Sequence, residues 1–137
     1  MHIDNLIRQH KTIYESIETL ETLIRKNNIE QDAFDVSLKL NLLMGTLKIH
    51  LQSEDEFLYP ALLNSGDDKI KTMAREYIGE MGSISSDFQA YKVQFDTKSK
   101  IIGNAQSFII STTQILKLLK NRLNKEDNLL YPTIENI

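Results

Sequence analysis

The sequence predicts an all-α fold, an up-down-up-down bundle of four helices, and two observations support this prediction. Apolar residues recur at alternating spacings of three and four along four long segments, which is the pattern of amphipathic helices. Only five glycines and two prolines interrupt 137 residues, so long helices are favoured over many short strands. Hydrophobic residues make up 41% of the chain, enough for one buried core, and we expect a single domain over residues 1–137.

The apolar stripes and the turn residues place the four helices. We expect them over about residues 3–26, 31–63, 70–95 and 104–133. The pair Asn27-Asn28 ends the first helix, and Pro60 should bend or stop the second near its end. A turn follows at residues 64–67, where Asn, Ser, Gly and Asp stand together. Residues 96–103 form a connection, and Asn104 is the expected cap of the last helix.

Polar side chains interrupt these stripes where the pattern requires core residues. The second stripe consists of Val36, Leu40, Leu43, Leu47, His50, Glu54, Phe57 and Ala61. The last stripe consists of Phe108, Thr112, Ile115, Leu119, Arg122, Glu126, Leu129 and Thr133. In the first helix, His10 holds a stripe position, and in the third Met81 does so. Because a buried carboxylate is costly unless it is paired or bound to a metal, these interruptions indicate a functional site.

The two halves of the sequence repeat one another around this site. Residues 50–62 and 122–134 are identical at six of thirteen positions. These are Leu51/Leu123, Glu54/Glu126, Asp55/Asp127, Leu58/Leu130, Tyr59/Tyr131 and Pro60/Pro132. His10 and Met81 stand at matching places, 71 residues apart. We therefore interpret the two halves of the chain as helical hairpins that are related by a pseudo-two-fold axis.

All four stripes of such a bundle face one axis, so the polar residues should converge there. Two imidazoles and two carboxylates, from His10, His50, Glu54 and Glu126, suit iron, manganese or zinc. A metal-free arrangement is the alternative, in which both carboxylates surround the Arg122 guanidinium and the histidines donate hydrogen bonds. We interpret Met81, and likewise Tyr59 and Tyr131, as packing residues.

Composition argues against several other classes of protein. The net charge of −3 offers no basic field for nucleic acid, and the absence of cysteine excludes disulfides and thiolate metal sites. With no apolar run of membrane-spanning length and no apparent signal peptide, we expect a cytoplasmic protein that does not contact a membrane. The sequence contains no nucleophile–base set and no glycine-rich phosphate loop. Its His-x-x-x-Glu order also differs from the Glu-x-x-His of ferritin-like enzymes, so we expect no enzyme activity.

The motif His-x-x-x-Glu followed by Leu-Tyr-Pro, with a second Glu and Leu-Tyr-Pro on the last helix, resembles the hemerythrin-like (HHE cation-binding) domains. The resemblance covers essentially the whole chain. It implies a four-helix bundle that holds a non-haem di-iron site, with bridging carboxylates from the second and fourth helices. By position, His10, His50, Glu54 and Glu126 match family ligands. Members carry or sense oxygen, respond to nitric oxide or redox state, or handle iron.

Two ligand positions of the family are missing from this chain. The family's third helix should supply a histidine where this chain has Met81, preceded by Glu80. The family's fourth helix should supply one where this chain has Arg122. The chain has three histidines in all, His2, His10 and His50. We interpret this loss as one metal site kept and a second replaced by Arg122, whose charge offsets part of that of Glu54 and Glu126. A divalent cation would then bring these three side chains from −1 to +1, or to neutral with a bound hydroxide.

We therefore expect a protein that binds one iron per chain, with zinc or manganese as other candidates. Open positions on such an ion would suit a small ligand such as oxygen or nitric oxide, so sensing oxygen, nitric oxide or redox state is the expected role. The alternative is a metal-free scaffold or interaction module with a buried Glu/Arg/His cluster. The sequence indicates no protein partner.

Overall fold

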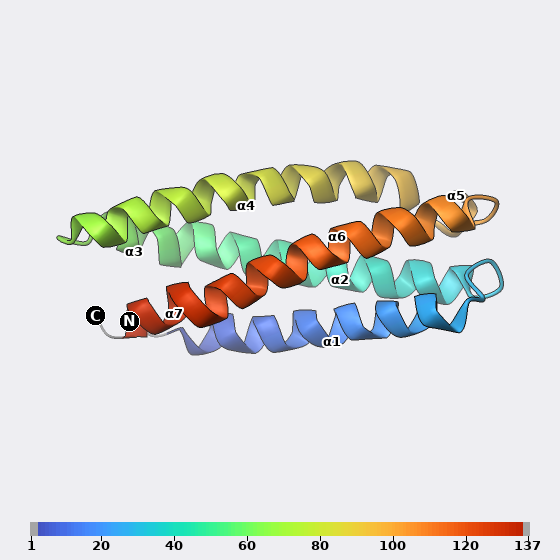
Figure 1. Cartoon of the computed structure of the whole chain (residues 1–137), viewed down its shortest axis with the longest axis horizontal. Coiled ribbons are helices and arrows are strands. Elements are labelled where there is room, and N and C mark those ends of the chain that lie inside the picture. The colour runs from blue at the N-terminus through green and yellow to red at the C-terminus, as the bar shows by residue number, and fades with distance from the viewer. Residues whose placement is uncertain (1–2, 136–137) are drawn as a thin grey trace.

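Helices account for nearly all of residues 3–135, the part of the chain that the computed structural model describes. The first two rods are α1 (Asp4–Lys26) and α2 (Ala33–Ser53), and α2 is continued by the π-helical turn η1 (Glu54–Leu58) and by α3 (Tyr59–Leu63). The third rod is α4 (Asp68–Phe95), which the short helix α5 (Lys98–Ile101) follows. The fourth rod is α6 (Ala105–Lys125), continued by the π-helical turn η2 (Glu126–Leu130) and by α7 (Tyr131–Glu135). These segments form four long helical rods that run alternately up and down (Figure 1). The predicted all-α bundle is therefore confirmed.

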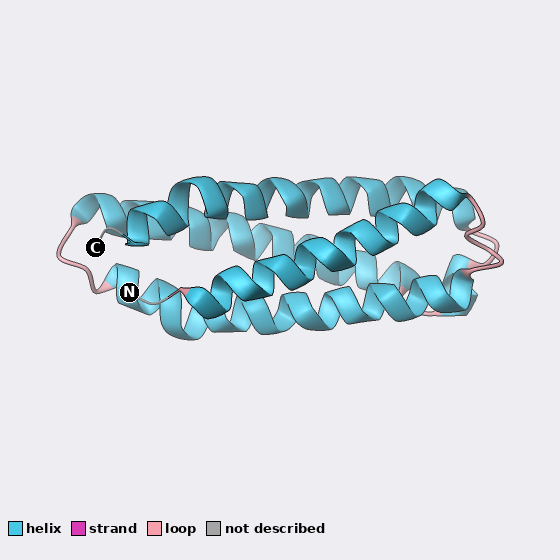
Figure 2. Ribbon diagram, turned by 90° about the horizontal axis from the view of Figure 1, so that it is seen from below, coloured by secondary structure: helices cyan, strands magenta, loops and turns pink. Residues whose placement is uncertain are grey.

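The rods lie side by side along their whole length, with the connections gathered at the two ends (Figure 2). Helix α1 packs against both α2 and α6, and α4 packs against α3 and α6. Each rod therefore contributes one face to a shared interior. No helix within residues 3–135 is long and apolar enough to cross a membrane.

The helix ends follow from local turn chemistry. Asn27 ends α1 in the left-handed conformation, with φ of 60°, as an asparagine tolerates. The Asp67 side chain caps α4 by accepting a hydrogen bond from the backbone N–H of Lys69. Asn104 precedes α6 as predicted, but its side chain makes no capping bond and instead donates to the Lys100 carbonyl. The predicted connection over residues 96–103 contains the short helix α5.

The buried apolar residues form two clusters. The larger includes Ile13, Leu43 and Leu119, and the smaller includes Leu58 and Leu130. Within residues 3–135, six polar residues are also buried: His10, His50, Glu54, Thr112, Arg122 and Glu126. All of them except Thr112 are the interruptions that the stripes predict, so the interior does accept these polar groups.

The stripe predictions fail just after each buried glutamate. Phe57 and Leu129 are 72% and 57% exposed, and Ala61 and Thr133 are exposed as well. The buried residues are those one position further along, Leu58 and Leu62 in one rod and Leu130 and Ile134 in the other, together with Tyr59 and Tyr131. The cause is the π-helical turn, in which the backbone N–H of Tyr59 bonds the Glu54 carbonyl, five residues back. One extra residue in a turn moves every later side chain by one position around the axis.

This register shift predicts a large difference between two neighbouring residues. Leu58→Ala should lower the free energy of unfolding by about 2–5 kcal/mol, because it leaves a cavity in the core. Phe57→Ala should change it by about 0.5 kcal/mol or less, because that ring is mostly in solvent. Urea unfolding of both variants measures the difference. If Phe57→Ala is the more damaging of the two, the uninterrupted stripe is correct and the π-helical turn is not.

Candidate metal centre

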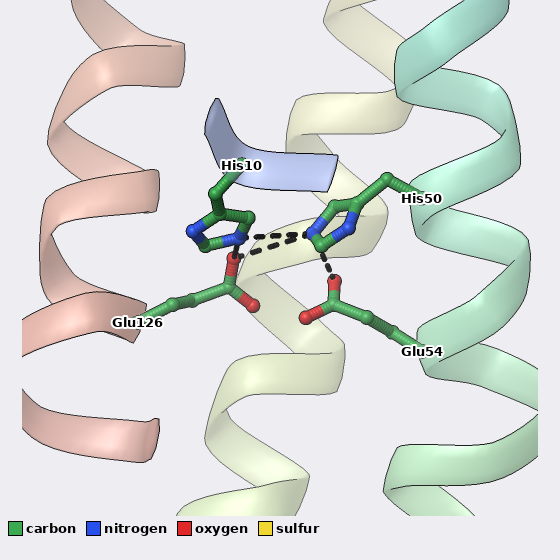
Figure 3. A group of neighbouring side chains, drawn as sticks. All are labelled: His10, His50, Glu54 and Glu126. Atoms are coloured by element: carbon green, nitrogen blue, oxygen red, sulfur yellow. Dashed lines mark hydrogen bonds and ion pairs between the residues drawn. The ribbon is translucent and has the colours of Figure 1, made fainter. Parts of the chain in front are cut away.

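Three of the four rods bring the predicted donor residues to one point. His10 comes from α1, His50 from α2, Glu54 from η1 and Glu126 from η2. One donor atom from each lies within 4.8 Å of all the others, and each side chain is at most 2% exposed. Figure 3 shows the two imidazole rings facing one another above the two carboxylates. The structure therefore brings together the four residues that the sequence singles out.

The donor atoms are close enough to share one cation. The Nε2 atoms of His10 and His50 are 3.0 Å apart, and His10 Nε2 lies 3.2 Å from Glu126 Oε1. On the other side, His50 Nε2 lies 3.4 Å from Glu54 Oε1 and 3.8 Å from Glu126 Oε1. Nitrogen and oxygen atoms that ligate one metal ion at about 2.0–2.2 Å lie at similar distances from one another.

The outward nitrogen of each imidazole has an acceptor that determines where the ring carries its proton. His10 Nδ1 lies 2.8 Å from a carboxylate oxygen of Asp127, which accepts hydrogen bonds and so requires an N–H at Nδ1. His50 Nδ1 lies 2.8 Å from Oε1 of Gln9. The Gln9 amide is oriented by Ser53, which donates its own proton to the Ile49 carbonyl and so accepts from Gln9 Nε2. Gln9 Oε1 therefore faces His50, and His50 Nδ1 carries the proton.

With both protons pointing outward, both Nε2 lone pairs point into the cluster. Two lone pairs 3.0 Å apart repel each other unless a proton or a cation lies between them. Two carboxylate oxygens of the same cluster, Glu54 Oε1 and Glu126 Oε2, are buried and have no hydrogen-bond donor. Neutral imidazoles and carboxylates with satisfied outer partners are the donor set of non-haem iron, zinc and manganese sites. The residues present therefore fit a divalent cation.

Burial and mutual contact shift the pKa values of this cluster in opposite directions. Burial, followed by the neighbouring Glu126, raises the pKa of Glu54 well above its usual value. Burial would also raise the pKa of Glu126, but its close contacts with Glu54, which holds a proton, and with the two imidazoles outweigh burial and lower that pKa. Burial lowers the pKa of His50, which keeps the ring neutral at neutral pH. Without a metal, the two glutamates therefore share one proton.

Arg122 is buried as predicted, but its ion-pair partner was not predicted. Its guanidinium donates to the Glu80 carboxylate and to the Tyr77 carbonyl, and it stacks 4.1 Å from the centre of the Tyr77 ring. Glu80 is about half exposed and also binds Lys125. Arg122 is thus paired with Glu80 at the bundle surface, and its charge offsets only part of the charge of Glu54 and Glu126. Met81 packs in the larger apolar cluster, which agrees with its interpretation as a packing residue.

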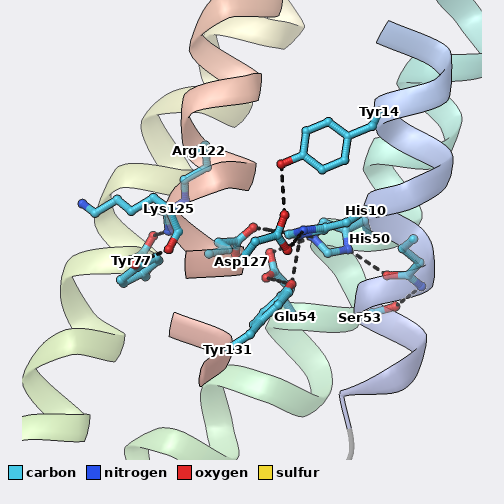
Figure 4. A network of polar contacts seen from close by, with 12 residues as sticks. His10, Tyr14, His50, Ser53, Glu54, Tyr77, Arg122, Lys125, Asp127 and Tyr131 are labelled. Carbon is cyan, nitrogen blue, oxygen red and sulfur yellow. Dashed lines mark hydrogen bonds and ion pairs between the residues drawn. The ribbon is translucent and has the colours of Figure 1, made fainter. Parts of the chain in front are cut away.

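Several residues of the site were missed by sequence reasoning. The Tyr131 hydroxyl lies 3.0 Å from His10 Nε2 and 3.3 Å from Glu54 Oε2, so it is part of the cluster and does more than pack. Figure 4 shows it below the level of the two histidines and next to Glu54, with Asp127 beside His10 and Tyr14 above Asp127. Tyr14 donates to the second oxygen of Asp127 at 3.0 Å. No periodic pattern marks Gln9 or Asp127, but each is the sequence neighbour of a ligand candidate.

The two outer partners give a direct prediction about metal affinity. Asp127→Asn and Gln9→Leu should each weaken metal binding about 10–100-fold, as loss of an outer partner of a metal-ligating histidine typically does. Asp55→Asn is the matched control, because Asp55 is the repeat counterpart of Asp127 but is exposed. Competition titration against a chelator of known affinity measures the dissociation constants. Equal affinities in all three variants would show that the histidine orientation does not depend on these partners.

Comparison with protein families identifies the chain. The family model of the hemerythrin HHE cation-binding domain matches residues 1–134. Comparison with curated proteins and with solved structures found no match. The match spans all four rods and includes every residue of the donor cluster. The chain therefore belongs to the hemerythrin family of HHE cation-binding domains.

Proposed function

We propose that this chain binds one iron ion through His10, His50, Glu54 and Glu126, and that it senses oxygen, nitric oxide or redox state. The observation that carries the proposal is the pair of imidazole lone pairs aimed at each other and at two carboxylates. Family membership supports cation binding in general. A cytoplasmic location and a binding role without enzyme activity are part of the same proposal.

The protein residues would each do a distinct part of the work. Asp127 and Gln9 hold the two imidazoles with their lone pairs inward, before any cation arrives. Glu54 and Glu126 supply the negative charge, and the surrounding apolar clusters exclude water. A bound iron ion would supply an open coordination position for a small ligand. Zinc or manganese would suit the same donors, but zinc has no redox chemistry, so a redox-sensing role favours iron over zinc.

Elemental analysis of protein purified from cells grown with iron, zinc and manganese tests this proposal. We expect about one metal ion per chain, mostly iron, because Arg122 brings a fixed positive charge to the other side of the glutamates. The matched variant His50→Ala should lose the metal, while Lys48→Ala, on the exposed side of the same helix, should keep it. Two irons per chain would contradict the single-site proposal.

A metal-free role is the second candidate, and one observation favours it. The raised pKa of Glu54 allows the cluster to hold a proton in place of a cation. The bundle would then act as a scaffold or interaction module. This candidate is the better one if the purified protein holds no metal and His50→Ala leaves its thermal stability unchanged.

A further inference from the structure

The Tyr131 hydroxyl lies among the donor atoms, although no sequence pattern assigns it a chemical role. Its oxygen is 3.0 Å from His10 Nε2 and 3.3 Å from Glu54 Oε2, and the side chain is 2% exposed. It is the first residue after the π-helical turn η2, and the extra residue of that turn rotates Tyr131 inward. Without the turn, Leu129 and Thr133 would face the interior in its place.

The separations match those expected of a fifth ligand. Atoms bound at about 2.1 Å to one ion lie about 3.0 Å apart as neighbours in an octahedron and about 3.4 Å apart in a tetrahedron. The two histidine nitrogens are 3.0 Å apart, and His50 Nε2 is 3.4 Å from Glu54 Oε1. The distances from the Tyr131 oxygen, 3.0 and 3.3 Å, fall in the same range. Tyr131 therefore lies at ligand-like distances from His10 Nε2 and from the second carboxylate oxygen of Glu54.

The other buried tyrosine near the carboxylates differs in one respect. The Tyr59 hydroxyl holds the matching position in the first half of the repeat, and it is also buried. Within residues 3–135 no hydrogen bond joins it to a donor side chain, whereas Tyr131 contacts two of them. The pseudo-two-fold repeat thus provides a natural control, with one phenol inside the donor set and one outside it.

We infer that Tyr131 is a fifth metal ligand, binding ferric iron through its phenolate oxygen. This inference rests on the proposed metal site. On binding, the O–H bond of Tyr131 breaks, its proton leaves to solvent and an iron–oxygen bond forms, while no electron moves. A hard phenolate oxygen favours ferric over ferrous iron and over zinc, so Tyr131 would select iron and stabilise its oxidised state.

The test uses the full-length protein loaded with ferrous iron and then oxidised by ferricyanide, which accepts one electron per iron. Iron–phenolate bonds give a visible charge-transfer band, and excitation within that band enhances tyrosine ring vibrations in the Raman spectrum. We expect both signals in the wild type and in Tyr59→Phe, and neither in Tyr131→Phe. Tyr131→Phe should also weaken ferric iron binding at least tenfold while changing zinc binding less.

A measurement on the unmodified sequence avoids dependence on how well the variant folds. Wild-type protein produced with ring-deuterated tyrosine should show the enhanced Raman bands at shifted frequencies. Retained iron without the charge-transfer band would overturn the assignment of Tyr131 and leave the four-ligand site intact. A band that is lost in Tyr59→Phe but kept in Tyr131→Phe would also overturn it. Failure of the wild type to retain any iron would instead remove the proposed function, and this inference with it.

Discussion

Replacing Glu54 by glutamine is expected to stabilise the metal-free protein at pH 8 by about 1–4 kcal/mol while weakening metal binding more than about 100-fold. Glu54 is 0% exposed, and one of its oxygens has no hydrogen-bond donor. Glutamine keeps the shape of the protonated acid, and its amide N–H can serve the neighbouring Glu126. It removes the cost of a second buried negative charge but also removes a ligand.

The stabilising effect should depend on pH with a definite sign. The pKa of Glu54 is higher in the folded state than in the unfolded chain, so the folded protein holds a proton that the unfolded chain has lost. Its contribution to the stability of the wild type is therefore greatest below the unfolded pKa and falls as pH rises toward the folded pKa. Glutamine does not titrate, so the advantage of Glu54→Gln should be small near pH 4.5 and grow up to pH 8. The lowered pKa of His50 acts in both proteins and cancels to first order.

Urea unfolding of chelator-treated protein at the two pH values measures this effect. Glu56→Gln is the control, since Glu56 is an exposed neighbour within the same π-helical turn and should show little change at either pH. If Glu54→Gln destabilises the metal-free protein equally at both pH values, Glu54 is already ionised and paired there. The two glutamates would then not share a proton in the metal-free protein.

Periodicity was sufficient to predict the bundle and the positions of its polar interior. The stripe on α4 is confirmed at every position, because that rod is regular from Ile70 to Phe95. The rods that contain η1 and η2 could be predicted only as far as Glu54 and Glu126. A run such as Phe57-Leu58-Tyr59 satisfies both a regular and a shifted register, so the apolar pattern does not distinguish between them. The choice depends on a backbone hydrogen bond that no side chain in the run specifies.

Contacts between distant segments limited the prediction of the site. Asp127 meets His10 across 117 residues, and its repeat counterpart Asp55 is exposed, so the repeat alone gave no sign of its role. The metal-free alternative placed Arg122 between Glu54 and Glu126, but its ion pair is with Glu80 on the adjacent rod. Both outcomes depend on how the rods are rotated against each other. Spacing within one helix does not contain that information.

Replacing Arg122 by methionine is expected to tighten binding of a divalent metal about tenfold or more, whereas substitutions of the donor residues and of their outer partners should weaken it. Arg122 is buried, and its positive charge partly offsets the rise that burial and Glu126 cause in the pKa of Glu54, so it acts on the same carboxylates that would bind a metal. A fixed cation near a second cation raises the cost of binding, and removing about 1.4 kcal/mol of repulsion suffices for a tenfold change. Methionine retains most of the packing of the aliphatic stem.

The same change should make the metal-free protein less stable by about 1–3 kcal/mol, because Glu54 and Glu126 lose their nearest buried counter-charge. Lys125→Met is the control: Lys125 shares the partner Glu80, but its side chain is 41% exposed, so its loss should cost about 1 kcal/mol or less and leave metal affinity nearly unchanged. Chelator competition and thermal unfolding, with and without metal, measure both effects. Unchanged or weaker metal binding in Arg122→Met would show that Glu80 neutralises the guanidinium fully. Arg122 would then be a structural ion pair, and it would not limit the number of cations that the two glutamates hold.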